Sequence, residues 1–221
     1  MMMTTTRSTR TLEREGLESE TPDLEAADET LAIVSLLPRP GEWEAEDYLW
    51  FTDRTNHLVE LSDGRIKVLP MPTDLHQGIV IVILNVLLGW TRSSGSGVVR
   101  MAPLRLRLTP DQFREPDVLL LLDAEDPRRA NQFWSGADLV VEVISRSNPE
   151  HDLVTKRAEY AAAGIPEYWI VDAEVGTLAV LTLGTSKDGA YAEHGVFGAG
   201  DLASSPLLAG LVVDVAAVLT G

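Results

Sequence analysis

The chain has 221 residues, 45% of them hydrophobic, which suffices for one well-packed core and is too little for two large ones. It contains no cysteine, which excludes disulfides, thiolate metal sites and cysteine nucleophiles. The formal net charge of −16 argues against a nonspecific nucleic-acid coat protein, because such binding depends on Lys and Arg.

Residues 1–30 have the composition of a disordered tail, with eight acids, three arginines and no aromatic residue. The N-terminus lacks the apolar segment of a secretory signal, and the longest apolar runs, near 79–88 and 118–122, are too short to span a bilayer. We therefore expect a cytoplasmic protein without membrane contact, with a disordered acidic tail over 1–30 and one domain over 31–221. Outside the tail 26 acids (34 less 8) outnumber 15 bases (18 less 3), so nucleic-acid binding requires a focused basic patch.

Helical and strand patterns alternate in the first half of the domain. Residues 43–50 predict a short helix with acids in its first turn, and residues 57–69 predict a hairpin. Apolar residues at helical spacing over 73–92 predict a mostly buried helix. Residues 98–108 alternate arginines with apolar residues, which predicts one or two strands with an arginine-bearing face.

The second half supplies the central strands. Residues 118–122 and 139–144 are continuous apolar runs, typical of strands covered on both faces. A helix is predicted from about 150 to 163, ended by Gly164, and 168–171 is another buried strand. Interleaved strands and helices indicate an α/β or α+β domain with a mixed sheet flanked by helices.

Three residues on successive core elements form a candidate site. Asp117 begins the first core strand, Glu142 lies inside the second, and Lys156 lies on the following helix. An ionised carboxylate within an apolar run is costly unless it is paired or bound to a metal. Mg²⁺ supplies such a partner, because it is usually held by one or two carboxylates, with water and substrate phosphate in its other positions. The ion activates a bound water, and a nearby ammonium offsets charge on the phosphorus.

The same region resembles a known family. The matching residues are Pro116-Asp117, the run Leu139–Ser145, and Asp152, Lys156, Tyr160 and Gly164–Asp172. They are similar to the Uma2 family, restriction-endonuclease-like proteins of the PD-(D/E)xK nuclease superfamily, and the likeness extends over about residues 40–220. It implies a restriction-endonuclease-like fold and Mg²⁺- or Mn²⁺-dependent endonucleolytic cleavage of DNA, with Asp117 and Glu142 as metal ligands and Lys156 as the catalytic ammonium. Nucleases of this superfamily often dimerise to cut both strands, so the implied partners are DNA and a second copy of the chain.

The position of the lysine departs from the superfamily pattern, which has Lys two residues after the acid. That position is Ile144 here, so Lys156 reaches the site from the next helix. The departure leaves open a catalytically inactive nuclease-fold protein that binds nucleic acid or a protein partner, and a structural module with chance acids. A hydrolytic triad of Ser145, His151 and Asp152 is disfavoured, because the last two are adjacent and no Gly-x-Ser-x-Gly motif is present.

Each member of the site also has a structural interpretation. Asp117 fits a strand start, Glu142 could pair with an arginine of 98–108, and Lys156 forms an ordinary i,i+4 pair with Asp152. Glu142 is the hardest to explain in this way, because its position inside an apolar run demands a partner.

Five further residues are candidates. Glu60 is either an additional acidic ligand or a hairpin residue, and His76 either contacts phosphate and carries a proton or only packs at a helix start. Arg100, Arg105 and Arg107 either face solvent or contact the nucleic acid.

Overall fold

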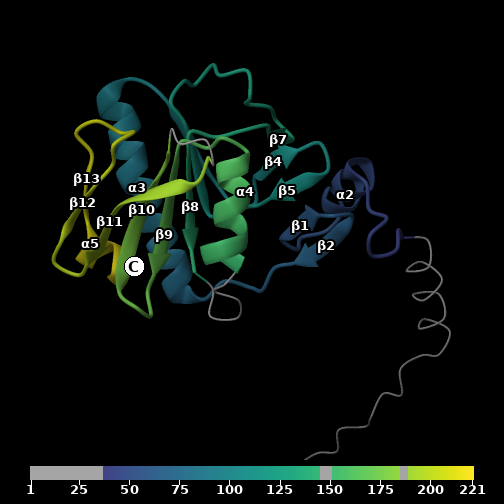
Figure 1. Ribbon diagram of the computed structural model, residues 1–221, viewed down its shortest axis with the longest axis horizontal. Coiled ribbons are helices and arrows are strands. Elements are labelled where there is room, and N and C mark those ends of the chain that lie inside the picture. Colours follow the sequence, from purple (N-terminus) through teal and green to yellow (C-terminus); the bar gives the residue numbers. More distant parts are fainter. Residues whose placement is uncertain (1–36, 145–150, 185–188) are drawn as a thin grey trace, which may run out of the picture. The chain divides into compact units, whose positions relative to one another are not determined.

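The computed structural model describes residues 37–144, 151–184 and 189–221, and the account below is confined to them. The tail predicted over 1–30 lies outside these residues. The described helices and strands all belong to one compact unit, Arg39–Gly221, which has the expected α+β class (Figure 1).

A six-stranded mixed sheet forms the centre of this unit, with the strand order β11-β10-β9-β8-β6-β3. Neighbouring strands are antiparallel, except for the parallel pair β8 and β9. Every residue of β6 and β8 is buried, which confirms the prediction of two central strands covered on both faces. The strands are β3 (Val98–Met101), β6 (Val118–Leu121), β8 (Leu139–Val143), β9 (Glu167–Asp172), β10 (Thr177–Leu183) and β11 (Tyr191–Gly198).

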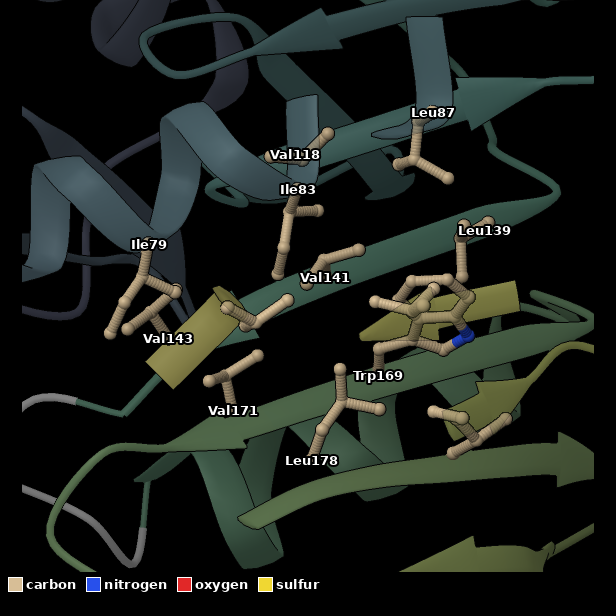
Figure 2. Packing of buried hydrophobic residues seen from close by; sticks show 14 of the residues in the cluster. Ile79, Ile83, Leu87, Val118, Leu139, Val141, Val143, Trp169, Val171 and Leu178 are labelled. Atoms are coloured by element: carbon tan, nitrogen blue, oxygen red, sulfur yellow. The ribbon is translucent and has the colours of Figure 1, made fainter. Parts of the chain in front are cut away.

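Helix α3 (Asp74–Ser94) covers one face of this sheet. Thr73 caps its start by accepting a hydrogen bond from the His76 backbone N–H at 3.2 Å, and Gly95 ends it with a left-handed backbone. Figure 2 shows Ile83 of α3 directed toward Val141 of β8, inside a continuous apolar core. By length and composition α3 could cross a membrane, but its buried side chains pack on the sheet.

The opposite face is covered by a turn of π-helix, η1 (His151–Lys156), which continues into α4 (Arg157–Ala162). A second core cluster, which includes Tyr160 of α4 and Val140 of β8, fills the space beneath. Because side chains alternate along a strand, Leu139, Val141 and Val143 face α3, whereas Val140 and Glu142 face α4. This alternation directs Glu142 toward the helix that carries Lys156.

A second sheet has the order β2-β1-β5-β4-β7 and adjoins helix α2 (Ala45–Thr52). The predicted hairpin is its pair β1 and β2. Residues 98–108 form two strands in different sheets, β3 and β4, so Arg100 does not share a strand with Arg105 and Arg107. The strands are β1 (Val59–Ser62), β2 (Arg65–Val68), β4 (Arg105–Thr109), β5 (Gln112–Arg114) and β7 (Phe133–Trp134).

The C-terminal segment completes the first core. Strands β12 (Leu202–Ser204) and β13 (Val212–Asp214) pair with each other, and α5 (Val215–Thr220) contacts α3. Buried Glu167 of β9 anchors this segment by accepting hydrogen bonds from the Ser205 hydroxyl at 2.6 Å and the Leu207 backbone N–H at 3.0 Å.

Candidate active site

Two adjacent strands bring Asp117 and Glu142 to the same end of the central sheet. Val118 of β6 pairs with Val141 of β8 in antiparallel register, so the next residue on each strand is Asp117 on one and Glu142 on the other. Directly opposed residues have Cβ atoms about 5 Å apart. The Oδ2 atom of Asp117 also accepts a hydrogen bond from the Val143 backbone N–H at 2.7 Å. The two predicted metal ligands are therefore cross-strand neighbours.

Glu142 is buried and receives two side-chain donors on one oxygen. Its Oε1 atom lies 2.9 Å from the Lys156 ammonium and 2.6 Å from the Tyr160 hydroxyl. Lys156 and Tyr160 are four residues apart along one helical segment, a spacing that places both on the same side. Lys156, displaced from the superfamily position, thus reaches the acid from the next helix.

Burial and the charge of Glu142 raise the pKa of the Tyr160 phenol well above its ordinary value. The phenol therefore stays protonated and donates its hydrogen bond to the carboxylate. The sequence interpretation assigned Tyr160 no role; its position four residues after Lys156 was the available signal.

Glu60 of β1 is fully buried and lies on the other side of the lysine. Its Oε1 atom is 3.3 Å from the Lys156 ammonium, so the ammonium lies between Glu60 and Glu142. The second oxygen of Glu60 lies 3.6 Å from the Arg114 guanidinium. Glu60, a residue of the predicted hairpin, thus contacts both Lys156 and Arg114.

Arg114 of β5 links the second sheet to α4. Its guanidinium forms a two-point fork with Glu159, with Nε–Oε2 at 2.7 Å and Nη2–Oε1 at 2.5 Å. Burial alone lowers the pKa of Arg114, but the hydrogen bonds to Glu159 and the charges of Glu60 and Glu159 raise it overall. The guanidinium stays charged and fixes the helix that carries Lys156.

Glu115 is a further buried acid beside this cluster. It accepts a hydrogen bond from the Val59 backbone N–H at 3.2 Å. Burial raises its pKa to about 8, although the Val59 hydrogen bond and the charge of Arg105 act in the opposite direction. Sequence reasoning missed Arg114, Glu115 and Glu159; the first two directly precede Pro116-Asp117, which was the only local signal.

His76 joins the site through Asp117. Its Nε2 atom lies 3.4 Å from Asp117 Oδ2, and both side chains keep a small solvent-accessible area, 18% and 16% respectively. This partly open pair marks the side from which a substrate could approach Asp117.

The three arginines suggested as nucleic-acid contacts have different surroundings. Arg105 forms an ion pair with Asp53 at 2.8 Å, and the Arg107 guanidinium lies 4.7 Å from the centre of the Phe133 ring. Arg100 is exposed on β3 and donates to its neighbouring carbonyl oxygen at 2.8 Å.

The composition of the cluster suits a divalent cation held by few protein ligands. Within the described ranges no group of three or more His, Asp or Glu residues is placed to hold a metal. Two carboxylates are nevertheless enough for Mg²⁺, which keeps several waters and takes substrate phosphate. Apart from Glu115, four carboxyl side chains and two basic side chains meet in this cluster. The carboxylates are Glu60, Asp117, Glu142 and Glu159, and the cations are Arg114 and Lys156.

Comparison with known proteins gives the family and the fold of the chain. The model of the family Uma2, described as "Putative restriction endonuclease", matches residues 45–216. Among solved structures, the chain is similar to the crystal structure of "a putative nuclease belonging to DUF820" from Anabaena variabilis. The two chains are 17% identical with a TM-score of 0.64, over 80% of this chain and 97% of that one, which shows a shared fold. No curated protein matches the chain.

Proposed function

The chain belongs to the Uma2 family, and on that premise we propose that it is a Mg²⁺- or Mn²⁺-dependent endonuclease that hydrolyses DNA phosphodiester bonds. One observation carries the proposal: two carboxylates on adjacent strands lie at one end of the sheet, and a buried ammonium contacts one of them. Metal-dependent hydrolysis of a phosphodiester uses this combination of metal ligands and a charge-stabilising cation.

Asp117 and Glu142 are the residues that would hold the cation. A bound Mg²⁺ supplies Lewis-acid polarisation of the phosphoryl oxygen and a bound water of lowered pKa. The hydrogen bond from Val143 orients Asp117, and the hydrogen bonds from Lys156 and Tyr160 orient Glu142. Both carboxylates are thus held in place by the protein, so little ordering is required when the site is filled.

Lys156 provides positive charge for the transition state. Its ammonium lies between Glu60 and Glu142, and the Arg114–Glu159 fork fixes the helix that carries it. A cation held in a water-poor position acts more strongly on developing phosphate charge than one in bulk water. His76, oriented by Asp117 on the partly open side, is the candidate for contacting phosphate or carrying a proton.

Plasmid cleavage tests this proposal. Purified protein with Mg²⁺ or Mn²⁺ should convert supercoiled DNA to nicked and linear forms, and EDTA should abolish the reaction. Glu142→Gln and Asp117→Asn should each abolish cleavage, while Arg65→Gln, on the exposed strand β2, should leave it intact. Metal-replete protein that nicks neither duplex, branched nor single-stranded DNA would contradict the proposal and favour a nuclease-fold protein that only binds a partner.

A further inference from the structure

A groove with three arginines lies along β3, the outer strand of the central sheet. Two adjoining hollows form it. The first, of about 420 Å³, is lined by Arg92 and Gly97 among others, and the second, of about 500 Å³, by Arg100 and Arg129. Ala124 lines both hollows, so they are neighbours. We call these two hollows the arginine groove.

The three arginines are available to an anionic ligand. No acid in the described part of the chain lies within ion-pair distance of Arg92, Arg100 or Arg129. Arg100 and Arg129 donate to the backbone carbonyl oxygens of Val99 and Ala124, at 2.8 and 2.6 Å. Among the other cations of the described residues, Arg105, Arg114 and Lys156 pair with acids away from the groove, and Arg128 pairs with Asp126 beside it.

Three acids, Asp123, Glu125 and Asp126, line the groove together with the three arginines. Asp126 is occupied by Arg128, whose Nη2 atom lies 2.6 Å from its Oδ2, and this contact lowers the pKa of Asp126. Asp123 accepts a hydrogen bond from the Glu125 backbone N–H at 2.9 Å and so turns toward its own loop. The two hollows are therefore lined by three arginines and three acids, and one of these acids, Asp126, is paired with Arg128.

The loop that presents Arg129 is fixed before any ligand arrives. Arg128 bridges Asp126 and Asp138, and Asp138 also accepts the Leu122 backbone N–H at 2.7 Å. These contacts join the two ends of the loop. Because the loop is held in one shape, little conformational entropy is lost when Arg129 binds an anion.

The three arginines differ in the face of the central sheet near which they lie: Arg92 belongs to α3, which covers one face, whereas Arg100 lies on the face that carries Glu142. Arg100 pairs with Leu119, and Leu119 pairs with Val140, so these side chains share a face. Glu142 lies two residues after Val140 and has the same orientation. Arg100 is thus the groove residue on the catalytic face of the central sheet.

We infer that the arginine groove binds the sugar–phosphate backbone of the DNA strand that extends away from the cleaved bond, an inference that rests on the proposed nuclease function. Strand β3, Val98–Met101, spans about 10 Å. One DNA strand advances about 3.4 Å per nucleotide, so this length matches about three nucleotides. Arginine forks suit phosphate oxygens, and the three arginines of the groove form no ion pair with an acid of the described residues.

Fluorescence anisotropy with labelled duplex DNA in EDTA tests this inference without cleavage. The plot of log K, where K is the association constant for DNA, against log salt concentration has a negative slope. This slope should become less steep by about one unit for each of Arg92→Gln, Arg100→Gln and Arg129→Gln, and by about three units in the triple variant. The loss should be equal for unrelated sequences, because phosphate contacts do not read bases. Glu125→Gln, in the same groove, should tighten binding, and Arg65→Gln on β2 should leave the slope unchanged.

The outcomes separate this inference from the proposed function. A triple variant with the wild-type salt slope overturns the groove assignment, even if the wild type cuts DNA. A reduced slope in the triple variant supports the groove, even if no metal restores cleavage. Wild-type protein that fails to bind DNA at low salt also overturns the inference. Circular dichroism should show an unchanged fold in every variant, since the substituted side chains are exposed.

Discussion

Tyr160 donates a hydrogen bond to the same oxygen of Glu142 that contacts the Lys156 ammonium. Two donors on Oε1 fix the rotation of the carboxylate, so the direction in which Glu142 can approach a cation is set by α4. The helix therefore contributes both a charge and an orientation to the site.

Replacement of Tyr160 by Phe should weaken metal-dependent cleavage without unfolding the protein. A hydrogen bond to a charged group contributes about 1.5–3 kcal/mol, so the rate should fall by roughly 10- to 150-fold. The concentration of Mn²⁺ for half-maximal cleavage should rise, because Glu142 is no longer oriented. Tyr191→Phe is the matched control, since it removes a hydrogen bond of 2.7 Å to the Ile165 carbonyl, away from Glu142. Equal losses in the two variants would contradict a positioning role.

Replacement of Lys156 by Met should destabilise the fold as well as abolish cleavage. The change leaves Glu60 and Glu142 without the ammonium between them, and breaking a buried ion pair from one side typically costs about 3–5 kcal/mol. Urea unfolding measures the loss. Adding Glu142→Gln to the variant should recover part of the stability, because one uncompensated carboxylate is removed; a double variant less stable than the single one would contradict the assigned pairing.

Stability should depend on pH through Glu115. Its folded-state pKa of about 8 is above the ordinary value of 4.5, so the favourable contribution is complete below pH 4.5 and is lost as pH rises through 8. Urea unfolding of the wild type should give a smaller free energy at pH 9 than at pH 6, by a few kcal/mol at most. Glu115→Gln should remove most of this difference. An equally steep pH dependence in Glu115→Gln would locate the titrating group elsewhere.

Replacement of Arg114 by Lys should reduce activity although the charge is kept. A lysine cannot reproduce the two-point fork to Glu159 while also facing Glu60. We expect a loss of about 1–3 kcal/mol in stability, from the lost charge-assisted hydrogen bond, and slower cleavage at saturating metal. Arg128→Lys, at the more exposed fork with Asp126, is the comparison: we expect a smaller stability loss there and unchanged single-turnover cleavage at saturating DNA, where a weaker groove has no effect on the rate.

Local sequence patterns predicted the central strands and the position of Glu142 well, because both depend on burial. The strands at β6 and β8 were visible as unbroken apolar runs, and an acid inside one of them signalled a partner. The contact between Lys156 and Glu142 required knowledge of how the next helix packs, which the family resemblance supplied.

Contacts between distant segments could not be predicted from periodicity. Arg105 pairs with Asp53, 52 residues earlier, and Arg114 with Glu159, 45 residues later. The alternating arginines of residues 98–108 looked like one surface, but the chain passes from one sheet to the other between β3 and β4. Strand alternation fixes which side a residue faces within a sheet and not which sheet it joins.

The candidate site can assemble only late during synthesis of the chain, because its residues come from segments far apart in the sequence. Glu60 and Arg114 come from one sheet, while Glu142 comes from the other and Lys156 from the helix on it. Chain segments from residue 60 to residue 159 must all be in place before the acids and the lysine meet. A nascent or half-folded chain thus carries the residues of the candidate site without the assembled site, so the proposed nuclease activity would be restricted to the finished molecule.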